Sequence, residues 1–446
     1  MTYWKQLIGI EGGDSPASLG LRLRAGIAWN FIAVFFNQGS TLAINIVVAR
    51  LLGRETFGEY AMLYSTLVVI STIAQLSTGY TSTKYVAEFR TVDKEKAGRL
   101  LTLCFLVSAV SAAIGAFALL GTSSWLAGVV LRAPHLVVGL KVGSAFLFFS
   151  TINGYQMGAL AGLEGYRGLA KAGVASGLAA LLGVSLGAYG YGLNGAMIGL
   201  ALTALLRCLL HNVWLRRELA RQGFGLRFEG LANEGSILYR FALPVALMTY
   251  VSFLTVWVAN LLLVRRPSGY AQLALYSAAT SIRLLVLFLP NVINNVGLSV
   301  LNNERGKGDL RRYREVFRVN VTMIFLAVLI PGMVLAIGGN AALGVFGRSF
   351  HEGYPVLVLL LLSTIPEGLS MGLYQLIQSQ EKMWLSFAFI VVPKEIVFLT
   401  LAYMLTRQYG AFGLAGAYLI AATVGLVSHS AIVLQLTKRK SIAAFA

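Results

Sequence analysis

The residues of this chain that could do chemistry are charged side chains placed inside long apolar stretches. Arg207, Arg283, Lys394, Glu367 and Glu395 each lie well within such a stretch. A charge at bilayer depth is costly, so it usually faces a partner or a hydrated cavity. The bases could hold a phosphate or diphosphate through charge-assisted hydrogen bonds. The two acids are candidates for coupling transport to protons or sodium.

Structural pairing is the alternative for these charges. Lys394 could form a purely structural salt bridge with Glu367, because Glu395 points about 100° away on the same helix. Arg283 differs, because no acid in its own stretch is placed to neutralise it. We therefore interpret Arg283 as a cation that faces an anionic substrate, with Arg207 somewhat nearer the cytoplasm in the same role.

Uncharged polar residues recur along the apolar stretches at helical spacing. When the first stretch is drawn as a helix, Asn30 and Asn37 share an arc of about 80° with Thr41 and Asn45. Gln75 belongs to a second polar stripe of the same width, with Ser71, Thr78 and Ser82. Such side chains suit sugar hydroxyls, although they could equally join helices at about 0.6 kcal/mol per contact. The candidate sugar-binding residues are Asn30, Asn37, Gln75, Asn291, Asn294, Tyr374 and Gln378.

Signatures of an enzyme or a cofactor site are lacking. The four histidines are dispersed, and no phosphate-binding P-loop is present. The two cysteines, Cys104 and Cys208, lie in apolar stretches and suggest neither a disulfide nor a thiolate metal site. We expect no catalytic residues, no metal and no cofactor.

The elements that must position these residues are membrane-spanning helices. Of the 446 residues, 57% are hydrophobic and 12% are charged, and the mean hydropathy is +0.73. Apolar stretches of about 20 residues, long enough to cross a bilayer, use up the chain and leave no room for a sizeable globular domain. We expect an all-α polytopic membrane protein whose helices lie near 24–49, 60–88, 98–120, 137–161, 171–189, 193–215, 240–264, 272–301, 315–338, 354–378, 384–406 and 413–436.

The distribution of basic residues predicts the orientation. The N-terminal tail, alternate connections and the C-terminal tail carry 24 Lys and Arg, and the opposite connections carry 7. Cytoplasmic loops hold the excess of bases in membrane proteins, so both termini are expected in the cytoplasm of a cell with an inner membrane. The bases do not gather into one footprint, so the net charge of +18 does not indicate nucleic acid.

The longest connection, 216–239, divides the helices into two sets of six. We expect a tail at 1–23, an N-lobe at 24–215, a C-lobe at 240–436 and a tail at 437–446, with a central cavity between the lobes. Similar segments precede the sixth and twelfth helices, Tyr189-Gly190-Tyr191-Gly192-Leu193 and Tyr409-Gly410-Ala411-Phe412-Gly413. Such repeats are typical of transporters that move two lobes about a shared site.

One run carries a resemblance to a known family. Val48-Ala49-Arg50-Leu51-Leu52-Gly53-Arg54-Glu55-Thr56-Phe57-Gly58-Glu59-Tyr60 resembles the A-R-x-L-G-x-x-x-F-G-x-Y hairpin of Wzx-type oligosaccharide flippases in the MOP exporter superfamily. The turn Gly162-Leu163-Glu164-Gly165-Tyr166-Arg167 and the Tyr-Gly segment before the sixth helix also look like that family.

The resemblance implies a flippase that moves an undecaprenyl-diphosphate-linked oligosaccharide repeat unit from the cytoplasmic to the outer leaflet by alternating access, with ion antiport. It also implies basic cavity residues: Arg283 and Arg207 match by depth, and Arg24 and Arg50 match more loosely. A polysaccharide polymerase and a chain-length regulator are implied partners, and the superfamily favours a monomer.

Other classes stay open at this point. A MATE-like multidrug or cation antiporter shares the twelve helices but needs an acidic cavity. A lipid II flippase of the MurJ type carries two further helices, for which the chain has no room. A membrane-embedded glycan polymerase or synthase would show a large outer loop, which is missing here.

Overall fold

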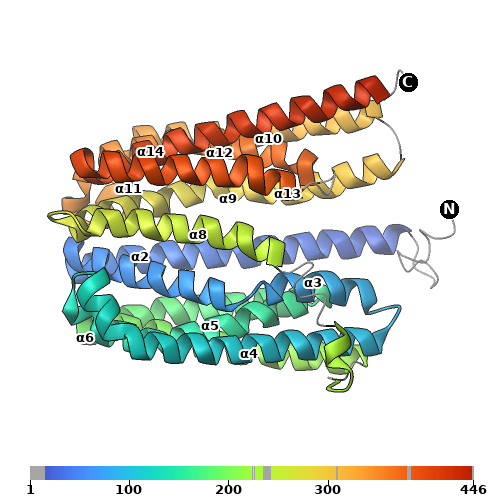
Figure 1. Ribbon diagram of the computed structural model, residues 1–446, viewed down its shortest axis with the longest axis horizontal. Coiled ribbons are helices and arrows are strands. Elements are labelled where there is room, and N and C mark those ends of the chain that lie inside the picture. The colour runs from blue at the N-terminus through green and yellow to red at the C-terminus, as the bar shows by residue number, and fades with distance from the viewer. Residues whose placement is uncertain are drawn as a thin grey trace. The chain divides into compact units, whose positions relative to one another are not determined.

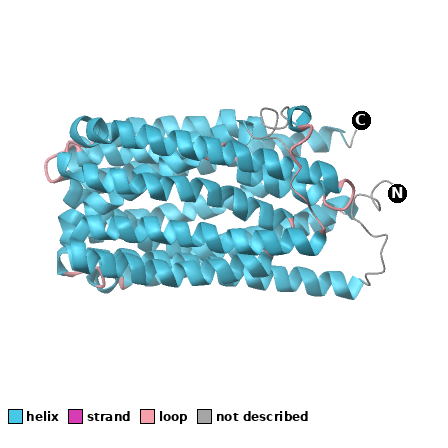
Figure 2. Ribbon diagram, turned by 90° about the horizontal axis from the view of Figure 1, so that it is seen from below, coloured by secondary structure: helices cyan, strands magenta, loops and turns pink. Residues whose placement is uncertain are grey.

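The computed structural model describes residues 16–223, 225, 227–234, 243–307, 310–378 and 383–443. In these ranges the regular structure is entirely helical, and Figure 2 shows no strand. The helices of the first half are α2 (Pro16–Ala74), α3 (Thr78–Phe89), α4 (Lys94–Trp125), η1 (Leu126–Val130), η2 (Pro134–Leu136), α5 (Val137–Gly162), α6 (Tyr166–Gln222) and η3 (Leu231–Glu234). They are drawn from blue to green in Figure 1.

The second half has the same character. Its helices are α8 (Leu243–Val264), α9 (Gly269–Lys307), α10 (Leu310–Ile337), α11 (Gly339–Gly344), η5 (Arg348–Gly353), α12 (Tyr354–Gln378), α13 (Met383–Ser386), η6 (Phe387–Val391) and α14 (Val392–Ala443). The elements η1 and η6 are π-helical turns that continue longer helices.

Three of the long helices are interrupted by residues with non-helical backbone angles. The interruptions lie at Gly53 in α2, at Tyr191 and Gly192 in α6, and at Gly410 in α14. The described residues contain nine helices long and apolar enough to cross a membrane, and each of the three interruptions divides one of them in two. The resulting twelve segments confirm the predicted all-α polytopic fold.

The predicted helix ends agree with the observed ones to within several residues at most positions. The expected helix at 60–88 differs, because Leu76 and Ser77 have positive φ angles of 47° and 54° and separate α2 from α3. Residues other than glycine rarely adopt such angles. This break could not be predicted from an uninterrupted apolar pattern.

Two compact units are defined by their internal contacts. Unit 1 comprises residues 1–41, 70–124 and 137–247, and unit 2 comprises residues 42–69, 125–136 and 248–446. Two segments of the first half, 42–69 and 125–136, thus belong with the helices of the second half. The predicted lobes, 24–215 and 240–436 with the linker 216–239, stay a prediction, as does a cavity between them.

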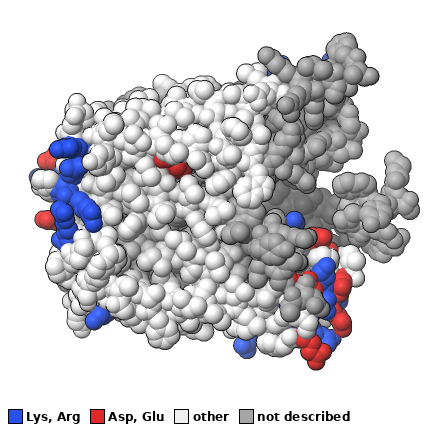
Figure 3. Space-filling model, in the orientation of Figure 1, with Lys and Arg blue, Asp and Glu red and all other residues white. Residues whose placement is uncertain are grey.

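Small residues let the helices approach closely inside each unit. In unit 1, a Cβ placed on Gly158 would lie 2.0 Å from the carbonyl oxygen of Gly79, so α3 and α5 touch through their backbones. Close backbone approach through small residues is typical of helix packing in lipid. Figure 3 shows the charged side chains of one face gathered near the ends of the helices, with a nearly uncharged surface between them. The chain is therefore a multi-pass membrane protein.

Candidate functional site

The central polar feature of unit 2 is a part-buried ion pair between α9 and α12. The Nη1 atom of Arg283 donates to Oε2 of Glu367, and the two side chains are 9% and 23% exposed. Tyr418 of α14 donates its hydroxyl to the same carboxylate oxygen at 3.2 Å. The guanidinium carbon of Arg283 lies 4.5 Å from the centre of the Tyr418 ring, a distance at which a cation is attracted to an aromatic face.

Three helices hold this cluster in place. Arg283 lies near the middle of the membrane-length part of α9, and Glu367 directly follows Pro366 inside α12. Within the described part of the chain, Nε of Arg283 is buried and makes no hydrogen bond, and the same holds for the hydroxyls of Thr280 and Ser370. These two residues lie one turn from Arg283 and Glu367 respectively, so the cluster retains unused hydrogen-bonding capacity.

The pairing corrects two interpretations made from the sequence. Arg283 is not an uncompensated cation in this structure, because an acid from another helix neutralises it. The alternative pairing of Glu367 with Lys394 is wrong, since Lys394 instead contacts its neighbour Glu395, with Nζ 3.2 Å from Oε1. A long lysine side chain can turn back across the 100° that separates adjacent helical positions, and Glu367 is occupied by Arg283.

Glu395 is the more buried partner of that second pair. Its side chain is 6% exposed against 32% for Lys394, and it accepts a further hydrogen bond of 3.0 Å from Ser252 in α8. The two acids predicted to couple ions therefore each have a basic partner in unit 2: Arg283 for Glu367 and Lys394 for Glu395.

Amide side chains form a separate network between α9, α10 and α12. Gln375 donates to both oxygens of Asn294, at 2.6 Å to the side chain and 2.8 Å to the backbone, and accepts 2.8 Å from Asn320. Asn291 donates to the backbone carbonyl of Leu287 in its own helix. The side-chain oxygen of Asn294 thus accepts a hydrogen bond from a neighbouring helix. This is the contact expected if such polar residues join helices and do not bind sugar.

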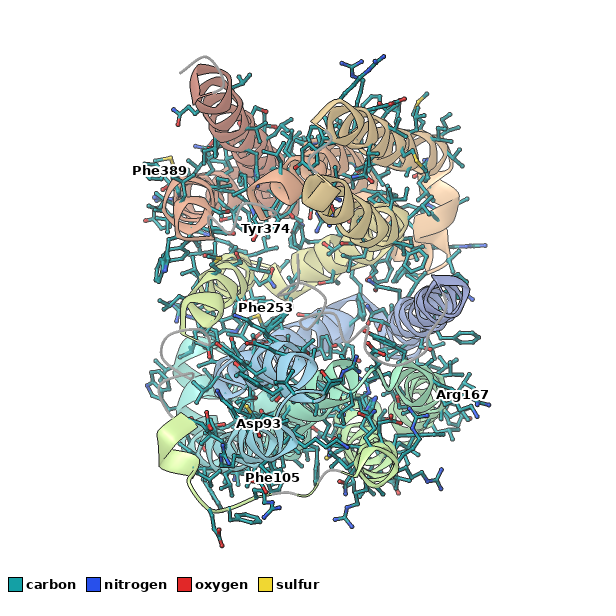
Figure 4. All side chains as sticks on the ribbon, turned by 90° about the vertical axis from the view of Figure 1, so that its right-hand side faces the viewer. Asp93, Phe105, Arg167, Phe253, Tyr374 and Phe389 are labelled. Atoms are coloured by element: carbon teal, nitrogen blue, oxygen red, sulfur yellow. The ribbon has the colours of Figure 1, made fainter. Side chains whose placement is uncertain are left out.

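Tyr374 lies on the neighbouring face of α12. Its ring packs edge-on against His429 of α14, with ring centres 6.0 Å apart. Figure 4, viewed along the helices, shows Tyr374 among the helices of unit 2, whereas Phe389 stands at their outer edge.

Unit 1 contains its own buried polar group. Asn153 of α5 contacts Nδ1 of His211 in α6 at 2.8 Å and Gln156 at 3.3 Å. Arg207 lies one turn before His211 on α6, and its backbone carbonyl is 3.0 Å from the same ring nitrogen. Gln75 packs against Gly154 of α5, with its Oε1 2.2 Å from where a Cβ would stand. Of the predicted residues, Arg207 therefore lies on α6, and Gln75 lies beside α5.

The remaining predicted residues fall in two groups. Arg50 lies at the hairpin inside α2 and is exposed, with Nε 2.6 Å from the carbonyl oxygen of Val345. The side chains of Arg24, Asn30, Asn37 and Gln378 lie outside the described residues.

Sequence reasoning missed several members of these clusters. Tyr418 and Ser252 are polar residues in apolar stretches and form no stripe. Gln375 lies about 80° around α12 from Glu367, whereas Tyr374 and Gln378 lie within about 20° of it. Helical spacing therefore selected Tyr374 and Gln378 and passed over Gln375. Asn153 and His211 gave no signal because their partners come from different helices. No group of three or more His, Cys, Asp and Glu in the described ranges is placed to hold a metal ion.

Comparison with known proteins identifies a family and a fold. Residues 23–298 match the family described as "Polysaccharide biosynthesis protein". The EPS I polysaccharide export inner membrane protein EpsE of Ralstonia nicotianae is 26% identical over 187 residues, which is 40% of this chain. The match spans only 41% of that relative's length.

Solved structures of similar fold cover nearly the whole chain. An inward-facing multidrug resistance MATE family transporter of the MOP superfamily aligns with a TM-score of 0.76 at 17% identity, over 90% of this chain and 96% of the other. A MOP superfamily transporter from Pyrococcus furiosus, described as having a binding pocket of reverse polarity, gives 0.69 at 16% identity over 95% and 97%. At these identities the likeness concerns the fold.

Proposed function

Because the chain belongs to the polysaccharide biosynthesis protein family, we propose that it moves a lipid-linked oligosaccharide across the inner membrane. The substrate is an undecaprenyl-diphosphate-linked repeat unit, taken from the cytoplasmic leaflet and released in the outer leaflet by alternating access. The name of the Ralstonia relative, an export inner membrane protein, supports the direction, and the fold shared with MATE transporters supports the mechanism. In this orientation both termini are cytoplasmic.

The observation that carries the proposal is the part-buried pair of Arg283 and Glu367. Two charges at bilayer depth cost several kcal/mol each to remove from water, and close pairing offsets that cost. A diphosphate oxygen can take the place of the Glu367 carboxylate on the guanidinium, because both are anionic oxygen acceptors of similar geometry. The buried Nε of Arg283 offers a further donor to the incoming group.

Ion coupling follows from the same pair. In the empty carrier the pair joins α9 to α12 and holds the two helices in one arrangement. Diphosphate on Arg283 breaks the pair for the outward step, and a proton on Glu367 breaks it for the return step. A ligand can shift a conformational equilibrium only by its differential affinity for the two states, and breaking the pair provides that difference. Antiport results when each step requires one of the two ligands.

The remaining predicted residues stay candidates within this proposal. Arg24, Arg207 and Lys394 are the further candidates for attracting the diphosphate, and the amides and Tyr374 are the candidates for contacting the sugars. Sodium on Glu367 or Glu395 would act as the proton does. The chain would work as a monomer beside a polysaccharide polymerase and a chain-length regulator, as the resemblance implies.

Complementation of a flippase-deficient strain tests the proposal. Wild-type protein should restore surface polysaccharide and remove the accumulated lipid-linked precursor. Arg283→Ala should abolish both effects at normal membrane abundance, and Arg283→Lys, which keeps the charge but not the bidentate geometry, should retain a part. A fully active Arg283→Ala variant would remove the residue from the mechanism.

A multidrug antiporter is the second candidate, because the chain has the MATE fold and two acids at membrane depth. Drug susceptibility of an efflux-deficient host separates the two functions. Raised resistance to cationic drugs, with no effect on precursor accumulation, would favour the second candidate.

A further inference from the structure

The hairpin that carries the family-like motif is docked on helices of the second half. Arg50 donates from Nε to the carbonyl oxygen of Val345 at 2.6 Å. Arg54 donates to the carbonyl oxygen of Ala271 at 3.2 Å and forms an ion pair of 2.5 Å with Glu352. All of these residues belong to unit 2. The motif's first arginine is therefore used in a contact between the two halves of the sequence.

Aromatic packing and a close backbone approach complete this contact. The ring of Phe57 lies 6.3 Å from Phe346 and 5.9 Å from Phe350, and all three side chains are only 1% exposed. A Cβ on Gly58 would stand 1.9 Å from the carbonyl oxygen of Tyr270. The motif's Phe-Gly pair thus fits against two separate segments of the second half, and only a glycine fits at position 58.

A second set of contacts runs from the second half of the sequence to the first. Arg265, at the end of α8, donates from Nε to the carbonyl oxygen of Val130 at 3.0 Å, and Tyr270 donates to Leu131 at 2.9 Å. Arg265 follows Arg50 by 215 positions, and Val345 follows Val130 by the same 215 positions. Each half therefore places an arginine from its first hairpin on the equivalent carbonyl of the other half.

The chemistry of these contacts suits an interface that opens and closes. Arg50 and Arg265 are both exposed, so water can replace each carbonyl when the contact breaks. A hydrogen bond of this kind contributes a small net free energy, because protein–water bonds are exchanged for protein–protein bonds. Conformational equilibria of carriers are balanced within a few kcal/mol, so two such bonds have a measurable effect without locking the protein.

We propose that the paired contacts of Arg50 with Val345 and of Arg265 with Val130 form an outer gate of twofold pseudosymmetry. The gate lies at the helix ends with few basic residues, which the orientation proposed above places on the outer face. This inference rests on the proposed alternating access. It assigns Arg50, a candidate for binding diphosphate, to gating instead. Opening toward the outer leaflet requires both arginines to leave their carbonyls.

A reporter cysteine at Ser281→Cys tests the gate. Ser281 is buried about three turns into α9, where it accepts a hydrogen bond of 3.0 Å from Asn45 of α2. A membrane-impermeant maleimide added to intact cells should label it slowly while the gate is closed. In the Arg50→Ala/Arg265→Ala double variant, labelling should be about tenfold faster, the effect of losing both bonds. The parent without the reporter gives the background from Cys104 and Cys208.

Arg348→Ala is the matched control. Arg348 is exposed and directly precedes Ser349, whose carbonyl oxygen accepts a hydrogen bond from Arg54. Within the described residues, the Arg348 side chain itself makes no hydrogen bond or ion pair. The control should label at the parent rate. Each single variant should give an intermediate rate, because the two contacts are equivalent. An unchanged rate in a double variant of normal abundance would overturn the gate. If the wild-type chain failed to complement the flippase-deficient strain, faster labelling of the double variant would retain the gate while the proposed function was overturned.

Discussion

Gly192 and Gly410 adopt nearly the same backbone conformation at equivalent places in the two halves. Their φ and ψ angles are 59° and −139°, and 55° and −131°. Each reverses the chain between two antiparallel membrane segments, before the sixth and the twelfth. Residues with a Cβ are strained in this region, which glycine enters freely. The shared conformation agrees with the matching Arg50 and Arg265 contacts, and both indicate an internal duplication.

Alanine at these two glycines should therefore destabilise the protein to different degrees. Backbone strain alone should cost about 1–3 kcal/mol at either position. At Gly410 the new Cβ would also stand 2.9 Å from Oε1 of Gln272, whereas nothing lies within 4 Å at Gly192. Gly410→Ala should accordingly lower the Tm in detergent more than Gly192→Ala does. Equal shifts would show that the Gln272 contact has no energetic effect.

Glu367→Gln should separate transport from its ion coupling. The amide imitates a protonated carboxyl, so the variant resembles the carrier whose pair is already broken. We expect export to persist and to become insensitive to an uncoupler that collapses the proton gradient, while wild-type export falls. Glu395→Gln serves as the comparison, because Glu395 is a buried acid of unit 2 that also has a basic partner. If only Glu395→Gln gave the insensitivity, Glu395 would be the coupling acid.

The pair of Lys394 and Glu395 should respond asymmetrically to removal of either partner. Lys394→Ala leaves a buried carboxylate with only Ser252 as a partner, at a cost of about 1–3 kcal/mol. Glu395→Gln leaves a lysine that is one-third exposed and can reach water, so its effect should be smaller. A thermal-shift measurement of both singles and the double gives their coupling. A double variant no more stable than Lys394→Ala would argue against the pairing.

Gly58→Ala should displace the docked hairpin without removing a charged contact. The clash is with the backbone of Tyr270 at 1.9 Å, which cannot move aside as a flexible side chain can. We expect faster labelling of the Ser281→Cys reporter and a lower Tm. Gly121→Ala in α4 is the control, since no atom lies within 4 Å of its Cβ position. Equal behaviour of the two variants would contradict the close docking of the hairpin.

The helices could be predicted from the sequence because apolar length reports bilayer crossing directly. The partners of the buried charges could not. Whether Glu367 meets Arg283 or Lys394 depends on the packing of α9, α12 and α14, and hydropathy contains no information about which helices are neighbours. Tyr418 was missed for the same reason, since one tyrosine in an apolar stretch gives no signal until the ion pair beside it is known.

The motif around Arg50 shows a second limit of sequence reasoning. Its resemblance to a family suggested a role in holding the substrate, because cavity arginines are typical of that family. In the structure its residues contact Val345, Phe350 and Tyr270, and a role of Arg50 in binding substrate stays a prediction. A motif marks residues under constraint, but the partner that imposes the constraint becomes visible only in three dimensions.

Mutual neutralisation of Arg283 and Glu367 has an electrical consequence. A unit charge that crosses the membrane potential gains or loses about 2.3 kcal/mol per 100 mV. The closed pair has no net charge, so voltage exerts no net force on the pair itself. In the proposed cycle, bound diphosphate makes the site negative, so that a negative cell interior drives it outward. Protonation of Glu367 leaves the positive charge of Arg283, and the voltage then drives the site back. The resting membrane potential would thus favour both loaded steps of the proposed cycle.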